Sequence, residues 1–148
     1  MATIIQVYNH TAQLFMSGQC PPGSAYKCEL LNNTAAFNAA HTQKTQVDGA
    51  GANEVSGNGW PVGGHALTNV ACAIANTNGA EFSADSIAQA IAGGSLGPYY
   101  KYLIYNDTLA NKPPLAFVTL NSPITVTDGN IATVIIGPNG LFSISVTP

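Results

Sequence analysis

The chain has 148 residues, of which 46% are hydrophobic and only 7% are charged, and its formal net charge at pH 7 is −3. This length fits one domain with a single core, and the combination of apolar content and low charge excludes a disordered chain. The four lysines are scattered singly and arginine is absent. We therefore expect no nucleic-acid partner, because phosphate binding needs clustered basic side chains.

The first residues carry neither the basic region nor the continuous apolar region of a signal peptide. No run in the chain approaches the roughly 20 apolar residues that span a bilayer. We therefore expect synthesis in a cytoplasm and no membrane partner.

A short helix is expected near the N-terminus, because Tyr8, Ala12 and Phe15 fall on one face at helical spacing. The prolines and glycines of GQCPPG, residues 18–23, end it.

The next stretch is predicted to be a half-buried strand. Its apolar residues alternate with polar ones: one face carries Tyr26, Cys28 and Leu30, and the other carries Lys27 and Glu29.

Residues 33–66 begin with an alanine-rich part that predicts a helical turn, and continue as a segment rich in glycine and asparagine without periodicity. Long irregular segments in compact domains are usually functional or ordered by a partner, and the alternative is a mobile surface loop. Trp60, the only tryptophan, is predicted to fill part of the core rather than to form a ligand platform, although it is kept as a contact candidate.

The second half predicts a series of strands. Residues 99–105 alternate with large apolar groups on both faces, which indicates a central strand covered on both sides. The sequence SIAQAIAGG predicts a helical turn, and DGN and GPNG predict tight turns between β-branched runs. The other expected strands cover residues 66–74, 80–84, 115–120, ITVT, IATVII and LFSISV.

These patterns predict an all-β fold, an antiparallel β-sandwich or barrel-like domain with a short N-terminal helix or arm. Residues 1–25 would form the arm, and residues 26–148 would form a single β domain. There is no βαβ alternation and no internal repeat.

Chemistry-bearing patterns are scarce, so we expect no catalytic, cofactor-binding or metal-binding residues and no enzyme activity. The aspartates lie in predicted turns, where their side chains bond to nearby backbone amides. The three histidines and three cysteines lack zinc-site spacing. Spacing leaves open a cysteine–histidine nucleophilic pair and a disulfide between Cys20 and Cys28.

Tyrosine suits contact surfaces, because it combines a large apolar ring with a hydrated hydroxyl group. Four tyrosines occur within residues 99–105, and we expect one face to join the core and the other to make contacts. The candidate contact residues are Tyr8, Trp60, Tyr99, Tyr100, Tyr102 and Tyr105.

Five motifs occur in a characteristic order: EVSGNGWPVGGHA, GGSLGPYYKYLIYND, KPPLAF, ITVTDGN and a final GLFSISV. In type and order they resemble a group of small virion proteins of tailed bacteriophages, over roughly residues 26–146. This chain departs from typical members in its CPPG turn and its low charge.

The resemblance implies a capsid decoration (cement) protein that binds the outer surface of the major capsid protein lattice and stabilises the head. The expected partners are the major capsid protein and the chain itself, as a dimer or trimer, and the expected location is the exterior of the virion. Residues 1–20 and 42–59 are the expected contact segments.

Two other functions compete with this expectation. A head-fibre or tail-associated module would recognise host-surface carbohydrate by stacking sugars on exposed tyrosines and Trp60. A small hydrolase would need a constellation of catalytic groups that the sequence does not display.

Overall fold

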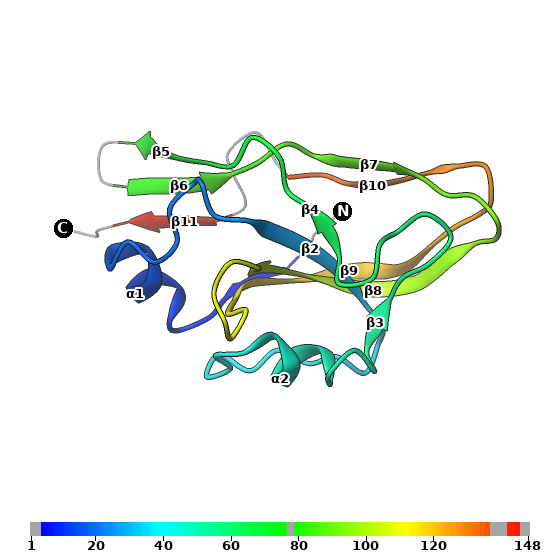
Figure 1. Cartoon of the computed structure of the whole chain (residues 1–148), viewed down its shortest axis with the longest axis horizontal. Helices are drawn as coiled ribbons and strands as arrows, with labels where there is room; N and C mark the ends of the chain where they lie inside the picture. Colours follow the sequence, from blue (N-terminus) through cyan, green and yellow to red (C-terminus); the bar gives the residue numbers. More distant parts are fainter. Residues whose placement is uncertain (1–3, 77–78, 137–141, 146–148) are drawn as a thin grey trace.

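The computed structural model describes residues 4–76, 79–136 and 142–145. Antiparallel strands are the main regular structure of the described chain, and two short helices accompany them (Figure 1). The prediction of an all-β fold is therefore confirmed.

The largest sheet has six strands and is antiparallel throughout. The predicted central strand is confirmed, because β8 lies between β9 and β2 and most of its side chains are buried. The strands in spatial order are β1 (Ile4–Val7), β9 (Pro114–Val126), β8 (Leu96–Asn106), β2 (Tyr26–Leu31) and β3 (Glu54–Val55), and β4 (His65–Ala66) also pairs with β2.

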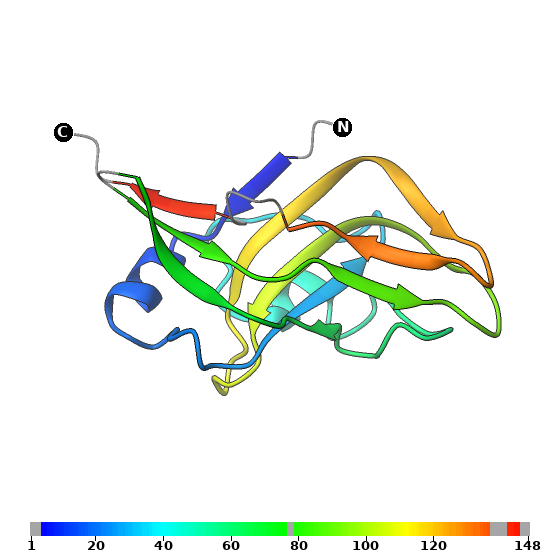
Figure 2. The same ribbon diagram turned by 90° about the horizontal axis from the view of Figure 1, so that it is seen from above.

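Two smaller sheets lie over one face of the six-stranded sheet (Figures 1 and 2). The strands are β5 (Ala71–Asn76), β6 (Gly79–Ser83) and β11 (Phe142–Ser145) in one sheet, and β7 (Ile87–Ala90) and β10 (Ile131–Val134) in the other. The larger hydrophobic core fills the space between the layers, where Phe82 and Val134 meet Tyr102 and Ile104 of β8. Burying apolar side chains of this size stabilises the fold by roughly 1.5–3 kcal/mol each.

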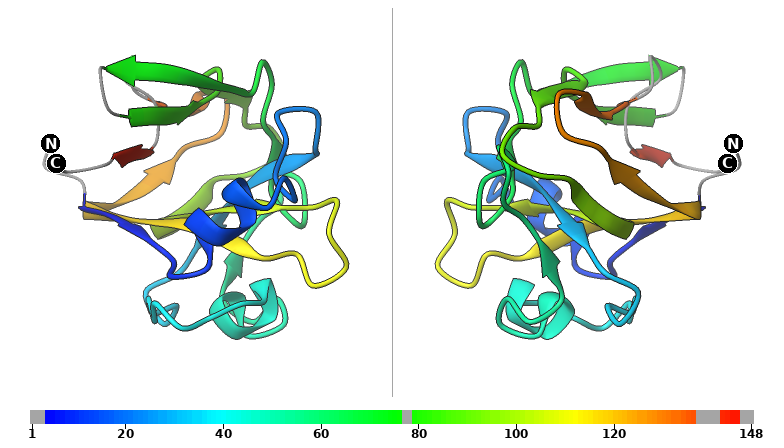
Figure 3. Two further views of the ribbon diagram at one scale, coloured as in Figure 1. Left: turned by 90° about the vertical axis from the view of Figure 1, so that its left-hand side faces the viewer. Right: turned by 90° about the vertical axis from the view of Figure 1, so that its right-hand side faces the viewer.

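Figure 3 shows α2 (Lys44–Asp48) on the opposite side of the six-stranded sheet from the two smaller sheets. A smaller core lies on this face. In it, Leu103 of β8 and Phe117 of β9 are grouped with Val47 of α2 and with Tyr8. The other helix, α1 (Thr11–Met16), follows β1. The central sheet is thus covered on both faces by different parts of the chain.

The predicted helices are only partly correct. A short N-terminal helix is present, but it begins at Thr11, so Tyr8 lies before it. The alanine-rich part of residues 33–41 contains no helix, and the helix of this region is α2, further along the chain. The helical turn predicted for SIAQAIAGG is wrong: Ile87–Ala90 is strand β7, because these residues pair with β10.

The N-terminal segment is not separate from the sheet. β1 pairs with β9 in regular register, from Ile4 opposite Thr119 to Val7 opposite Ala116. The turn after ITVT is present, but the strands that flank it do not pair with each other: β9 pairs with β8, whereas β10 pairs with β7. GPNG, residues 137–140, lies outside the described residues.

Two of the recurring sequence motifs contact each other. The Nδ2 atom of Asn58 in GNGW donates a hydrogen bond to the carbonyl oxygen of Ser95 in GGSLG, at 2.7 Å. The backbone N–H of Ala92 donates to the carbonyl oxygen of Asn58 at 2.9 Å. The two motifs together therefore form one corner of the fold.

Close backbone contact explains one glycine of the GGH motif. A Cβ atom at Gly64 would lie 2.4 Å from the carbonyl oxygen of Cys28 on β2, and φ is +87°. Only glycine satisfies both conditions. Gly51 also has a positive φ, of +94°, but no atom lies within 4 Å of the Cβ position.

We predict that Gly64→Ala lowers the free energy of unfolding by at least about 3 kcal/mol, because backbone strain and a clash with β2 add together. The matched variant Gly51→Ala suffers the strain alone and should lose about 1–2 kcal/mol. Urea unfolding of both variants measures the difference. Equal losses would contradict the close contact with β2.

Among the described residues, no helix has both the length and the apolar character needed to cross a membrane.

Candidate functional site

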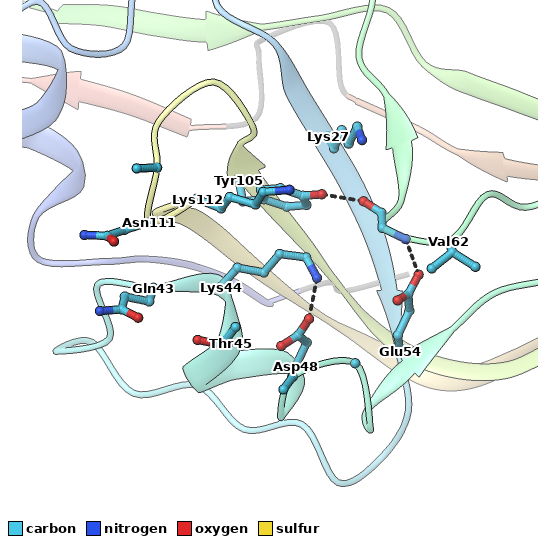
Figure 4. A pocket seen from close by; sticks show the side chains of 14 residues that line it. Lys27, Gln43, Lys44, Thr45, Asp48, Glu54, Val62, Tyr105, Asn111 and Lys112 are labelled. Atoms are coloured by element: carbon cyan, nitrogen blue, oxygen red, sulfur yellow. Dashed lines mark hydrogen bonds and ion pairs between the residues drawn. The ribbon is translucent and has the colours of Figure 1, made fainter.

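A pocket of about 620 Å³ opens beside α2, next to the outer part of β2 and the loop that follows β8 (Figure 4). Its lining combines polar and apolar groups and includes three of the four lysines of the chain. The side chains that line it include Lys27, Gln43, Lys44, Thr45, Asp48, Glu54, Val62, Tyr105, Asn111 and Lys112.

A buried ion triad forms the floor of this region. The Nζ atom of Lys44 lies 2.8 Å from Oε1 of Glu29 on β2, and it also forms an ion pair with Oδ2 of Asp48, one helical turn further along α2. The exposed fractions of the side chains are 13% for Lys44, 0% for Glu29 and 2% for Asp48. Charged groups are rarely buried so fully unless they are paired.

Local sequence positions the lysine. Gln43 and Gln46 form a reciprocal capping box at the start of α2, and Gly49 ends the helix in the left-handed conformation. The backbone N–H of Lys44 donates to the carbonyl oxygen of Lys112 at 3.1 Å, which ties the helix to the loop after β8. Lys44 and Asp48 are four residues apart, so both side chains lie on the same face of the helix.

Burial raises the pKa of Glu29 to about 7, although the ammonium group of Lys44 acts in the opposite direction. Burial alone would lower the pKa of Lys44, but its hydrogen bonds to Asp48 and Glu29 outweigh this effect and raise it. Lys44 therefore stays charged at neutral pH, while Glu29 is near the midpoint of its titration.

A tyrosine and an acid hold the wall of the pocket around Gly63. The hydroxyl group of Tyr105 donates to the carbonyl oxygen of Gly63 at 2.5 Å. The backbone N–H of Gly63 donates to Oε1 of Glu54 at 2.6 Å. Nζ of Lys44 lies 5.4 Å from the centroid of the Tyr105 ring, within the range of a cation–π interaction. Figure 4 shows these groups around the same opening.

Two further lysines share one carboxylate. Nζ of Lys27 lies 3.0 Å from Oδ2 of Asp107, and Nζ of Lys112 lies 2.8 Å from Oδ1. Burial acts to raise the pKa of Asp107, but hydrogen bonds from Lys112 and Lys27 outweigh it and lower this pKa below its usual value. This side of the pocket thus carries two positive charges against one negative charge.

The predicted contact residues lie mostly in the interior. Tyr8, Trp60, Tyr99, Tyr102 and Tyr105 are buried, and only Tyr100 is partly exposed. Five of the six candidate rings are therefore covered by the chain itself, because it covers both faces of the sheet, and their contact role stays a prediction. Trp60 belongs to the larger core, as the sequence predicted.

A β-bulge changes the expected faces of the tyrosine-rich strand. Tyr99 belongs to the same core as Tyr102 and Ile104, although simple alternation places it with Leu103. The pairing with β9 shifts between Tyr99 and Lys101, so the alternation restarts there.

All three cysteines are free thiols, Cys20 and Cys28 buried and Cys72 exposed. Burial raises the pKa of Cys28 far above its usual value, which disfavours the reactive thiolate. His65 packs against the ring of Trp60, with 5.5 Å between ring centroids, and its Nε2 atom lies 3.2 Å from Oε1 of Gln89. Within the described ranges, no three His, Cys, Asp or Glu side chains gather as metal ligands would.

Comparison of the chain with models of protein families, with curated proteins and with solved structures finds no significant match. The functional argument therefore depends on the geometry of the chain itself.

Sequence reasoning missed the charged pocket. It interpreted Asp48 and Asp107 as turn residues and placed Glu29 on a polar strand face, because each was considered only with its neighbours in sequence. The one available signal was the scarcity of charge: in such a chain, Lys44 and Asp48 at helical spacing form a conspicuous pair.

We predict that Lys44→Met lowers the free energy of unfolding by about 3–5 kcal/mol, because it leaves Glu29 and Asp48 buried without their cation. The matched variant Lys112→Met removes a half-exposed lysine from a surface ion pair and should cost less than about 1 kcal/mol. Chemical denaturation at pH 7 compares them. Similar losses would contradict the assignment of Lys44 as the buried partner.

Glu29 should also make stability depend on pH. Its pKa is about 7 in the folded chain against 4.5 for the free side chain. The folded state therefore holds the proton more tightly, so this contribution to stability is full below pH 4.5 and is lost as pH rises to about 7, by at most about 3 kcal/mol.

Glu29→Gln should flatten the decline in stability between pH 4.5 and 7.5, which unfolding curves at several pH values would measure. Glu81→Gln, a substitution of the same type at a partly exposed position, should leave the decline unchanged. An equally steep decline in the Glu29 variant would show that other groups cause it.

Proposed function

We propose that this chain is a capsid decoration protein of a tailed bacteriophage, which binds the outer surface of the major capsid protein lattice and stabilises the head. The observation that carries the proposal is the apolar edge strand β1, which is exposed in a chain with very few charges. The order of sequence motifs described above supports the same function.

β1 lies at one end of the six-stranded sheet, and within the described residues only β9 pairs with it. Its apolar side chains remain accessible, with exposed fractions of 61% for Ile4, 45% for Ile5 and 41% for Val7. Proteins usually protect such edges with lysine, proline or a bulge. The sequence of β1, IIQV, contains none of these residues, and its register is regular.

An unprotected edge accepts an extended segment of a partner, which adds a strand through backbone hydrogen bonds. The proposed occupant is an extended segment of the major capsid protein. Four residues of edge form a contact far smaller than the roughly 1,600 Å² of a standard interface. Retention therefore requires the many equivalent sites and additional contacts that a lattice supplies.

Stabilisation of the head follows from mass action, because a protein that binds only the assembled shell shifts the equilibrium toward that shell. The low charge of the chain suits dense placement, since neighbouring copies repel one another little. The competing carbohydrate module has less support, because Trp60 and four of the five candidate tyrosines are buried.

The proposal predicts that the purified chain co-sediments with expanded capsids that lack it and raises their melting temperature. Ile5→Lys places a charge on the β1 edge and should weaken binding about tenfold or more, since a charge in an apolar contact must be desolvated. Val62→Lys changes an even more exposed apolar residue away from β1 and should bind normally.

Loss of retention in both variants, or in neither, would contradict the role of β1, and no retention of the unmodified chain would overturn the function. The other possible occupant of the edge is β1 of a second copy of the chain. Sedimentation of the chain alone tests for this pairing. That pairing would appear as a dimer that Ile5→Lys dissociates.

A further inference from the structure

The fold has a second opening, an apolar cavity of about 310 Å³ between the six-stranded sheet and the layer above it. Strands β8 and β9 form one side of this cavity, and β10 with the residue that follows it forms the other. Three consecutive residues, Thr133, Val134 and Ile135, line it, so it lies along an edge of β10. The proposed capsid contact uses β1 and gives the cavity no purpose.

A bulge in β9 accompanies the cavity. Tyr99 pairs with Ile124 and Lys101 pairs with Thr119, so five steps along β9 match only two along β8. Extra residues of this kind bend the strand that carries them, and Figure 2 shows the bend of β9 in yellow and orange. Leu120 and Ile124, at the two ends of the bulge, both line the cavity, which therefore lies at the bend.

Two tyrosine hydroxyl groups offer hydrogen bonds at the cavity. The rings of Tyr99 and Tyr102 belong to the larger core and line the cavity. Neither hydroxyl group has a hydrogen-bond partner among the described residues, and neither oxygen is sealed from solvent. Burial raises the pKa of both hydroxyl groups above the usual value of tyrosine, so both keep their protons at neutral pH. Each can therefore donate a hydrogen bond to a molecule in the cavity.

The lining and the volume define the class of ligand. Within the described ranges, no Asp, Glu, Lys or His side chain lines the cavity, so an ion placed there would lose its hydration without gaining a counter-ion. A dry apolar cavity of about 150 Å³ holds one benzene ring, and a cavity of about 310 Å³ therefore has room for two fused rings. Apolar walls with a few polar groups are typical of sites for small molecules.

We propose that the apolar cavity binds an uncharged molecule of two fused rings with one hydroxyl or carbonyl oxygen, which accepts a hydrogen bond from the hydroxyl group of Tyr99 or Tyr102. Leu120, Ile124 and Val134 supply the apolar contacts to the rings. Ile135, whose exposed fraction is 71%, lies at the entrance. This inference is independent of the proposed function: capsid binding could fail while the cavity binds its ligand, and the reverse.

Titrations followed by amide chemical shifts in nuclear magnetic resonance spectra test the proposal with three probes: 2-naphthol, phenol and naphthalene-2-carboxylate. At pH 7, 2-naphthol should shift the resonances of β10 and of the bulge in β9. Its affinity should be at least about tenfold above that of phenol, which buries less apolar surface, and above that of the carboxylate, which must be desolvated. Equal affinity for the carboxylate, or no shifts with 2-naphthol, would overturn the proposal.

Two pairs of variants locate the site. Thr133→Trp places a large ring at the cavity and should weaken 2-naphthol binding about tenfold or more, whereas Ile131→Trp, two residues earlier on β10 and outside the lining, should bind normally. Both positions are exposed, so both variants should fold. Unchanged binding in Thr133→Trp would contradict the site.

The second pair tests the hydrogen bond. The double variant Tyr99→Phe with Tyr102→Phe keeps both rings and should weaken 2-naphthol binding about fivefold, since it removes both donors. Tyr100→Phe, on the same strand but outside the lining, is the control and should have no effect. Unchanged binding in the double variant would contradict the role of the hydroxyl groups.

Discussion

Burial of both faces of the sheet formed by β2, β8 and β9 is the constraint on which the rest of the structure depends. Successive residues of β8, such as Leu103 and Ile104, point into different cores, and neither is exposed to solvent. A strand that is apolar on both faces must be covered twice. The chain provides one cover with five additional strands and the other with the segment that contains α2.

The second cover is small, and it carries the ion triad. Val47 is the buried apolar residue of α2, whereas Lys44 and Asp48 are held through charge. Buried ion pairs contribute little net stability, but their geometry is demanding. We therefore interpret the triad as a device that holds α2 at one position against β2. The same contacts that cover the smaller core then also determine the shape of the pocket.

Strong alternation made parts of this fold predictable. Residues 99–105 and the strand from Tyr26 both show large apolar groups at a period of two, and both form strands. Two of the four residues of β7 are alanines, which favour helix over strand, so local preference did not predict the strand that pairing with β10 produces. Tertiary pairing decided this segment.

The site was less predictable than the fold, because its parts are distant in sequence. Nothing near Glu29 indicates that Lys44 will cover it. The irregular pairing that places the ring of Tyr99 in the larger core follows Gly97 and Pro98, residue types that often mark a bulge in a strand. The contact residues were chosen by residue type, which cannot tell a buried tyrosine from an exposed one. The glycine-rich motifs were better guides, since Gly64 and Asn58 mark places where backbones meet.

The concentration of charge at one pocket leaves the remaining surface almost neutral. Glu81, Asp85, Lys101 and Asp128 are the charged residues outside the pocket and its pairs. Colloidal stability of the free chain must then come from hydration of asparagine, threonine and serine rather than from mutual repulsion. Such a solution responds weakly to added sodium chloride, but sulfate, which is excluded from protein surfaces, will salt the chain out readily.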